Sequence, residues 1–315
     1  MKKILVTGGC GFIGSHLVEH LVEIGHDVIC FDRYNSDGYL YNLNNSKYKN
    51  EIEFFLGDIR DIDSLKKATN NVSSILHLAA LISIPYSYLS PLAYIKTNIE
   101  GTYNVLEIAK DQNIDETIIT STSEIYGTAQ FTPMNESHPI NGQSPYAASK
   151  IAADQLSLSY FRSYNLPLKI IRPFNNYGPR QSNRAVIPTI ISDVISKKKE
   201  ITLGNINTKR DFLYVKDTVL AYLKLLNSKK YYGEVFNFGS GISYKISDVV
   251  KDIQKINNSN KKINISSNKL RPENSEVFDL VADCKKSIDL LQWFPKYSFA
   301  DGLLETNDWF LKNYS

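Results

Sequence analysis

The sequence has 315 residues, and its 36 lysine and arginine residues nearly balance 33 aspartate and glutamate residues, which gives a net charge of +3 at pH 7. With 43% hydrophobic and 22% charged residues, the composition is that of a globular protein that buries its own core, which excludes collagen-like, disordered and small disulfide-dependent proteins. The lysines are dispersed, so we expect no nucleic-acid partner. No stretch approaches the roughly 18 apolar residues of a membrane span, so we expect no membrane partner.

Three cysteines, Cys10, Cys30 and Cys284, occur without a CxxC pair and without histidines at metal-ligand spacing. This pattern predicts no disulfide and no bound metal, and it is typical of a reduced, cytoplasmic protein.

Short β-branched and apolar runs alternate with helical patterns through the first half of the chain. The predicted strands span 4–6, 28–31, 53–56, 74–78, 117–120 and 169–171, and the predicted helices span about 11–24, 91–111 and a segment that begins near 144. Because the strands are almost continuously apolar, the rhythm predicts an α/β fold, a doubly wound parallel sheet of the Rossmann type covered by helices on both faces.

The pattern changes after Arg172 and Pro173, where proline, glycine and asparagine become frequent and the later elements are shorter. We therefore expect a first domain at 1–173 and a smaller, mixed α/β domain made of 174–210 and 241–315. Segments near 211–240 are expected to return to the first domain.

A glycine-rich turn follows the first predicted strand and opens the first predicted helix. Gly8 permits the tight turn, Gly11 permits close approach of a pyrophosphate, and Gly14 permits close packing of the helix on the sheet. The strand before the turn and the helix after it are the context that makes this pattern a dinucleotide-binding site.

An acidic residue, Asp32, ends the second predicted strand. A carboxylate at this position accepts hydrogen bonds from a ribose 2′-hydroxyl and repels a 2′-phosphate, which favours NAD over NADP. Arg33 beside it is the feature that would instead suit a 2′-phosphate.

A tyrosine and a lysine, Tyr146 and Lys150, are spaced i and i+4 and so share one helix face. The reference pKa of tyrosine is near 10, and a neighbouring ammonium lowers it toward the range in which the phenol acts as a base. The polar segment 121–127 follows the fifth predicted strand, at the end of the sheet where ligands bind in such folds.

Together these motifs resemble the extended short-chain dehydrogenase/reductase family, and more narrowly its NAD-dependent nucleotide-sugar epimerases and dehydratases. The resemblance spans nearly the whole chain and also rests on Gly57-Asp58, His77-Leu78-Ala79-Ala80, Asn98 and Arg172-Pro173-Phe174-Asn175. It implies an NAD-binding first domain, a nucleotide-sugar-binding second domain and a homodimer built through the helices at 91–111 and 146–164.

The resemblance also implies roles for individual residues. Tyr146 takes the proton of the sugar C4 hydroxyl, Lys150 holds the nicotinamide ribose and lowers the pKa of Tyr146, and Thr122 hydrogen-bonds the same sugar oxygen. The residues implied to bind NAD are Gly8, Gly11, Phe12, Ile13, Gly14, Asp32, Asp58, Ile59, Leu78, Ala79, Ala80, Asn98, Tyr146, Lys150 and Pro173.

The reaction that follows oxidation at C4 depends on Glu124. A 4-ketone acidifies the C5 hydrogen, so a carboxylate there can remove it and expel the C6 hydroxyl as water, as the resemblance to 4,6-dehydratases implies. Glucose-type dehydratases carry an Asp-Glu pair at this point, whereas this chain has Ser123 before Glu124, and serine is a poor general acid. A UDP-hexose 4-epimerase, a UDP-glucuronate decarboxylase and a cofactor-sensing binding protein without catalysis stay open as alternatives.

Two further segments, 78–88 and 181–188, resemble dehydratases that act on nucleotide-linked N-acetylglucosamine, as in the legionaminic acid pathway. The substrate implied is a UDP- or GDP-linked hexose, and the hexose implied is N-acetylglucosamine.

Arginine is scarce in this lysine-rich chain, and a planar guanidinium binds phosphate in a bidentate manner that lysine cannot reproduce. By resemblance, the nucleotide diphosphate is contacted by Arg210 and Arg271, with Arg180 and Asn175 as further candidates. We expect Arg172 to be structural.

Overall fold

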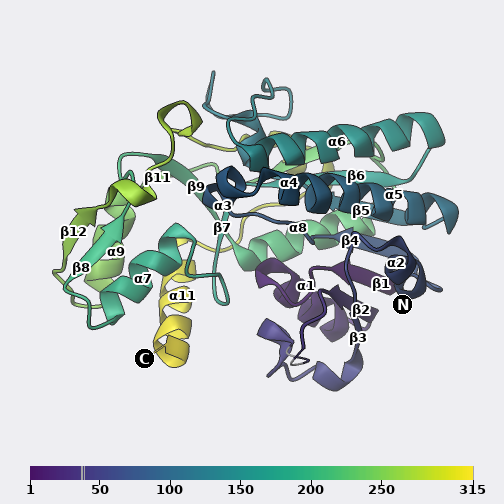
Figure 1. The fold of residues 1–315 in the computed structure, drawn as a ribbon, viewed down its shortest axis with the longest axis horizontal. Coiled ribbons are helices and arrows are strands. Elements are labelled where there is room, and N and C mark those ends of the chain that lie inside the picture. The colour runs from purple at the N-terminus through teal and green to yellow at the C-terminus, as the bar shows by residue number, and fades with distance from the viewer. Residues whose placement is uncertain (37, 39, 315) are drawn as a thin grey trace. The chain divides into compact units, whose positions relative to one another are not determined.

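The computed structural model describes residues 1–36, 38 and 40–314 (Figure 1). These residues form two compact units. Among the described residues, unit 1 comprises those within 1–125, 144–172 and 219–236, and unit 2 comprises 126–143, 173–218 and 237–314.

Unit 1 is built on a seven-stranded sheet in the order β10-β6-β5-β4-β1-β2-β3, and its pairings from β3 through β6 are parallel. The strands are β1 (Lys3–Thr7), β2 (Asp27–Asp32), β3 (Ile52–Leu56), β4 (Ser74–His77), β5 (Glu116–Thr120), β6 (Leu168–Pro173) and β10 (Val235–Phe238). The order 3-2-1-4-5-6 is that of doubly wound dinucleotide-binding folds, so the predicted fold class is confirmed.

Helices cover both faces of this sheet, with α5 and α6 on one side and α1 and α8 on the other (Figure 1). Their bounds are α1 (Phe12–Glu23), α2 (Ile62–Ala68), α3 (Ile84–Leu89), α4 (Pro91–Tyr94), α5 (Gly101–Asp111), α6 (Pro145–Tyr164) and α8 (Val215–Asn227), with short helical turns at Tyr41–Leu43, Lys49–Glu51 and Ser123–Tyr126. A buried apolar cluster joins Leu5 and Ile75 of the strands to Val105 of α5 and Leu158 of α6. This packing fixes the helices against the strand ends.

Helix α6 begins where the sequence signals a start. The Ser144 hydroxyl accepts a hydrogen bond from the backbone N–H of Ala147 at 3.1 Å, and Pro145 occupies the first helical position. This cap sets the start of α6 and thereby places Tyr146 in its first turn.

The helix expected at 91–111 contains a π-helical segment, Ile95–Glu100, between α4 and α5. A π turn widens the helix locally and is frequent at functional sites. Here it carries Asn98, which is buried.

Unit 2 contains a three-stranded mixed sheet in the order β11-β9-β7 and a parallel pair of β12 and β8. Its elements are β7 (Asn175–Tyr177), β8 (Glu200–Leu203), β9 (Lys209–Tyr214), β11 (Ser243–Lys245), β12 (Lys262–Ile265), α7 (Val186–Ile195), α9 (Ile246–Ile256), α10 (Lys285–Leu291) and α11 (Phe299–Tyr314), with short turns at Ser267–Lys269 and Glu273–Ser275. Within the region near 211–240 that was expected to return to the first domain, Val235–Phe238 joins the main sheet as β10. The strand β9, which reaches Tyr214, stays instead in the smaller sheet, because β7 and β11 pair with its two edges.

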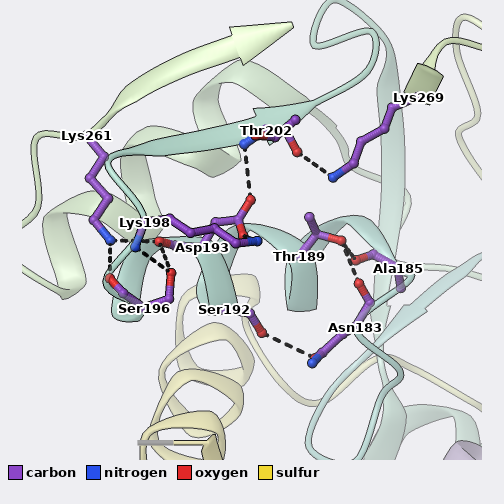
Figure 2. A network of polar contacts seen from close by, with 10 residues as sticks. All are labelled: Asn183, Ala185, Thr189, Ser192, Asp193, Ser196, Lys198, Thr202, Lys261 and Lys269. Carbon is purple, nitrogen blue, oxygen red and sulfur yellow. Dashed lines mark hydrogen bonds and ion pairs between the residues drawn. The ribbon is translucent and has the colours of Figure 1, made fainter. Parts of the chain in front are cut away.

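The end of α7 is tied to β8 by a polar network (Figure 2). The Asp193 carboxylate accepts hydrogen bonds from the Thr202 N–H at 3.1 Å and from Lys198 at 2.5 Å. The Lys261 ammonium donates to the carbonyls of Asp193 and Ser196, at 2.7 and 2.6 Å. A cation on these last carbonyls is favourable because the helix dipole is negative there.

Within the described residues, no helix is both long and apolar enough to cross a membrane.

One prediction concerns a fully buried ion pair between β5 and β6. The Lys169 ammonium contacts the Glu116 carboxylate and also donates to the carbonyl of Leu225 at 2.8 Å. Changing Glu116→Gln leaves a buried ammonium without its counter-charge, so we expect the free energy of unfolding to fall by about 3–5 kcal/mol in urea denaturation. The matched control is Glu53→Gln, which breaks the exposed pair with Lys3 and is expected to cost less than about 1 kcal/mol. Equal losses in the two variants would contradict this account.

Candidate active site

The glycine turn in unit 1 leaves room for a phosphate group at the start of α1. Gly8 has a positive φ of 72°, and a Cβ there would lie 2.9 Å from the backbone of Ala79. A Cβ on Gly14 would collide with the carbonyl of Gly8. Gly11, the N-cap of α1, provides no side-chain cap. The N–H groups of the first turn of α1 thus receive no side-chain cap from Gly11, which is the arrangement predicted for a pyrophosphate-binding helix N-terminus.

Asp32 is held at the end of β2 by the same turn. Its carboxylate accepts hydrogen bonds from the N–H groups of Cys10 at 2.9 Å and Arg33 at 2.8 Å. Burial raises the pKa of Asp32, and these two hydrogen bonds act in the opposite direction. The carboxylate is thus fixed where a ribose hydroxyl of a dinucleotide would meet it.

An open cleft of about 450 Å³ lies beside the end of β2, where Arg33 is part of its lining. It is lined by Arg33, Tyr34, Tyr41, Leu56, Gly57, Asp58, Arg60, Asp61 and Ser64. Arg60 binds the Asp58 carboxylate through Nε at 2.9 Å and Nη2 at 2.6 Å, and this contact lowers the pKa of Asp58. The lining includes Asp58, one of the residues predicted to bind NAD.

The end of β4 is braced by buried polar contacts. His77 lies between the hydroxyls of Thr7 at 2.8 Å and Thr102 at 3.1 Å, and burial lowers its pKa to about 3. Thr7 also accepts the N–H of Ala79 at 3.2 Å. This neutral histidine therefore fixes the loop that begins at Leu78.

Asn98 holds the next part of that loop. Its amide accepts from the N–H of Leu81 at 2.8 Å and donates to the carbonyl of the same residue at 2.9 Å. A second donation, at 2.9 Å, goes to the hydroxyl of Ser149 on α6. Asn98 thus joins the loop after β4 to the helix that carries Tyr146.

Ile59 and Pro173 complete the predicted cofactor residues. Ile59 is buried, and its carbonyl accepts the Asn104 amide at 2.9 Å. Pro173 ends β6 and is the first residue of a segment that belongs to unit 2.

Tyr146, Thr122 and Lys150 come together at the end of β5. Tyr146 is 7% exposed and shares a side-chain hydrogen bond with Thr122. The Lys150 ammonium donates to the carbonyl of Thr120 at 2.5 Å. The Tyr146 ring packs edge-on against Tyr94, with ring centres 6.2 Å apart. These contacts leave the phenol as a buried acid or base.

Burial shifts the pKa values of both ionisable groups of this cluster. Burial raises the pKa of Tyr146, while the hydrogen bond to Thr122 lowers it and the charge of Glu124 raises it further. Burial lowers the pKa of Lys150 to about 8, and the charge of Asp154 acts in the opposite direction. Tyr146 therefore becomes a base only with a positive charge nearby.

The two residues after Thr122 are also buried. Ser123 is 2% exposed and Glu124 is 7% exposed. The backbone N–H of Glu124 donates to the Thr122 hydroxyl at 3.3 Å. The short helical turn Ser123–Tyr126 thus sets a carboxylate next to the pair formed by Tyr146 and Thr122.

The four predicted substrate residues belong to unit 2. The arginines Arg210 of β9 and Arg271 converge on the Glu276 carboxylate, with nitrogen–oxygen distances of 3.7 and 3.9 Å. Asn175 of β7 has a buried amide oxygen without a hydrogen-bond partner among the described residues. Arg180 lies in the turn after β7 with a φ of 71°.

Arg210 is positioned by its neighbour in the chain. The buried Asp211 carboxylate accepts hydrogen bonds from the N–H groups of Ser240 at 2.7 Å, Gly241 at 2.9 Å and Ala282 at 3.0 Å. These contacts fix β9 at the residue that follows Arg210.

Two candidate site residues, Asp154 and Glu276, were not identified from the sequence. Asp154 could have been found from its spacing, because it follows Lys150 by four residues and so shares the face of α6 that carries Tyr146. Glu276 had no such signal, since its contact with two arginines depends on the fold of unit 2.

A family model described as GDP-mannose 4,6 dehydratase matches residues 5–306. A human dTDP-D-glucose 4,6-dehydratase is 31% identical over 322 residues, which cover 99% of this chain and 91% of the human protein. A crystal structure of a dTDP-glucose 4,6-dehydratase from Streptomyces venezuelae, with NAD bound, has a TM-score of 0.89 at 29% identity and covers 99% of this chain and 97% of its own. A UDP-N-acetylglucosamine 4-epimerase from Methanobrevibacter ruminantium has a TM-score of 0.89 at 32% identity, with 99% and 98% covered.

The chain therefore belongs to the GDP-mannose 4,6-dehydratase family, among the extended short-chain dehydrogenases/reductases that act on nucleotide sugars. It is an enzyme of this family, and the predicted family, enzyme class and NAD cofactor are confirmed. The assignment of individual residues to the site stays a prediction.

A second prediction concerns cofactor selection by Asp32. In Asp32→Asn the charge that repels a 2′-phosphate is lost while the side-chain shape is kept, so we expect the ratio of the Kd for NADP to the Kd for NAD to fall by about tenfold or more in calorimetric titrations. The control is Arg33→Ala, which should leave the NAD affinity within about twofold. Tighter binding of NADP than NAD by the unaltered protein, lost in Arg33→Ala, would show that Arg33 and not Asp32 selects the cofactor.

Proposed function

We propose that this protein is an NAD-dependent nucleotide-sugar 4,6-dehydratase that acts on a UDP- or GDP-linked hexose. The observation that carries this proposal is the buried Glu124 carboxylate beside the hydrogen-bonded pair of Tyr146 and Thr122. Oxidation at C4 requires only a base at the sugar hydroxyl, whereas elimination across C5 and C6 also requires a second base, and Glu124 is that second group.

When bound, NAD accepts a hydride from C4 of the sugar and later returns it at C6. Tyr146 takes the proton of the C4 hydroxyl, and Thr122 donates a hydrogen bond to the same oxygen. Lys150 holds the ribose and, as an ammonium, favours the phenolate form of Tyr146. These three residues account for oxidation at C4.

Glu124 then removes the C5 hydrogen, which the adjacent ketone makes acidic, and the C6 hydroxyl leaves as water. The protonated Glu124 exchanges its proton with solvent and then protonates C5 after reduction at C6. Serine is too weak an acid to protonate the leaving hydroxyl itself, so in this proposal the Ser123 hydroxyl relays a proton from solvent to it. The proton that Tyr146 takes from the C4 hydroxyl returns to solvent, which balances this step.

The nucleotide diphosphate is the proposed ligand of unit 2. Arg210 and Arg271 share the Glu276 carboxylate, which shows that two guanidinium groups can reach one anionic acceptor. Asn175 supplies a buried amide oxygen with unused acceptor capacity among the described residues, which suits a hydroxyl of the ribose or the sugar, and Arg180 adds a further cation for the phosphates. The sugar is N-acetylglucosamine in this proposal, on the resemblance of the segments 78–88 and 181–188.

A UDP-hexose 4-epimerase is the second candidate. Ser123 favours it, because an epimerase needs no general acid at that position and only requires the ketone to turn over before its reduction. The two reactions share Thr122, Tyr146 and Lys150 and differ in their need for Glu124.

We also propose that the enzyme acts as a cytoplasmic homodimer. The helices from α3 to α5 expose large apolar side chains, including Leu89 at 82%, Leu92 at 60% and Ile95 at 51%. Clustered apolar residues of this size mark interaction surfaces on a protein that otherwise buries its hydrophobic residues.

The dimer is tested by sedimentation equilibrium. The unaltered protein is expected at twice the 35.7 kDa chain mass. Leu92→Asp places a charge in the apolar surface and is expected to give the monomer with an unchanged circular dichroism spectrum. A monomer at micromolar concentration in the unaltered protein would refute the proposal.

The reaction is tested by incubation with UDP- and GDP-linked hexoses, with and without N-acetyl groups, followed by mass spectrometry. Dehydration lowers the product mass by about 18 units and, in deuterated water, places one deuterium at C5. We expect Glu124→Gln to slow this product by about 10²–10⁴-fold, because it removes a general base without a change of shape.

The control for that experiment is Tyr146→Phe, which should bind NAD normally and fail to oxidise the sugar at all. Full dehydration by Glu124→Gln would refute the base role. An unchanged product mass with a new sugar signal would establish the epimerase instead, and a loss of about 44 units would establish a decarboxylase.

A further inference from the structure

A buried charge cluster that the proposed reaction steps do not use lies along α6. Asp154 is 0% exposed and follows Lys150 by one helical turn. Its Oδ2 accepts a hydrogen bond from the Ser121 hydroxyl at 2.7 Å and from Arg172 Nε at 3.2 Å and Nη2 at 3.1 Å. Its Oδ1 has no hydrogen-bond partner among the described residues.

We propose that Asp154 is a positioning residue that keeps Lys150 protonated, while the charge of Arg172 keeps Asp154 ionised. The charges then alternate from β6 into α6, with Arg172 positive, Asp154 negative and Lys150 positive. The inference rests on the proposed function only for its consequence, because a neutral Lys150 would no longer favour the phenolate of Tyr146.

A buried ammonium needs a counter-charge, since water does not reach it to stabilise the charged form. Lys150 is 4% exposed, and the carbonyl of Thr120 stabilises it only as a dipole. Tyr222 of α8 holds Thr120 in place through a 2.6 Å hydrogen bond between the two hydroxyls. The full negative charge on α6 comes from Asp154.

The other titratable groups that face Lys150 do not replace that charge. His77 of β4 is uncharged because burial lowers its pKa to about 3. Tyr146 is uncharged because burial raises its pKa, and Tyr222 is uncharged for the same reason. Arg172 of β6 repels an ammonium, and the charge of Glu124 acts on Tyr146.

The pKa values agree with this arrangement in direction. Burial lowers the pKa of Lys150 to about 8, and Asp154 is the group that opposes this shift. Burial raises the pKa of Asp154, while Arg172, the Ser121 hydrogen bond and Lys150 lower it. Because the folded-state pKa of Lys150 is close to neutral, loss of the Asp154 charge moves its titration into the working range.

The test measures the titration of Lys150 directly by NMR, in full-length protein labelled with ¹³C at lysine Cε, without added cofactor or sugar. The Lys150 resonance is assigned by its loss in Lys150→Arg. In the unaltered protein we expect a midpoint near pH 8. In Asp154→Asn we expect the midpoint to fall by about one pH unit or more, a tenfold loss of proton affinity. Asp154→Glu should restore it.

The matched control is Ser121→Ala, which removes a hydrogen bond to Asp154 and keeps every charge, so its Lys150 midpoint should stay within a few tenths of the unaltered value. If Asp154→Asn fails to fold, the double variant Asp154→Asn, Arg172→Met leaves no unpaired guanidinium. It should still lower the midpoint, because Asp154 is the charge that acts on Lys150. A midpoint unchanged from the unaltered protein in either variant would overturn the proposal. Because the readout needs no turnover, it is independent of whether the reaction is dehydration or epimerisation.

Discussion

The parallel pairing of β1 with β4 and of β4 with β5 is the constraint on which the rest of unit 1 depends. It brings the carboxyl ends of three strands to one edge, and each end carries a different part of the site: the glycine turn after β1, the loop from Leu78 after β4, and Thr122 after β5. The helices that follow β1 and precede β6 then supply a phosphate-binding N-terminus and the face with Tyr146. The order of the strands alone thus brings the candidate binding and proton-transfer residues, which lie far apart in the sequence, to one edge of the sheet.

Buried charges in this protein are compensated within the same structural unit. At β5 and β6, Lys169 meets Glu116 and helix carbonyls, and its role is to hold α8 to the sheet. Toward the other end of β6, Arg172 forms a second buried ion pair with Asp154, and this pair acts on the titratable Lys150. The first pair is remote from the residues assigned to the reaction, whereas the second controls the charge beside Tyr146. Identical chemistry therefore serves stability in one place and electrostatic tuning in another.

The sequence was sufficient for the features that depend on short-range pattern. The parallel sheet, the turn at Gly8, the start of a helix near Ser144 and the helix face shared by Tyr146 and Lys150 all follow from local sequence pattern. The π segment around Asn98 was not predicted, because its wider turn leaves no periodic signal over so few residues. β9 was expected near the main sheet, because an apolar run does not indicate which strands it will pair with. Only the fold reveals its pairing with β7 and β11. The meeting of Arg210 and Arg271 at Glu276 likewise joins residues far apart in the chain.

The buried position of Glu124 makes deprotonation of Tyr146 harder, and other residues must oppose this effect. The charge of Glu124 raises the pKa of Tyr146, so in the proposed dehydratase reaction Glu124 opposes the first proton transfer while it enables the second. An epimerase without such an acid would not face this conflict. In this site the opposing positive charge comes from Lys150, whose own pKa is lowered by burial, and the charge of Lys150 depends in turn on Asp154. The more firmly Glu124 is placed for elimination, the more the oxidation at C4 depends on that buried chain of alternating charges.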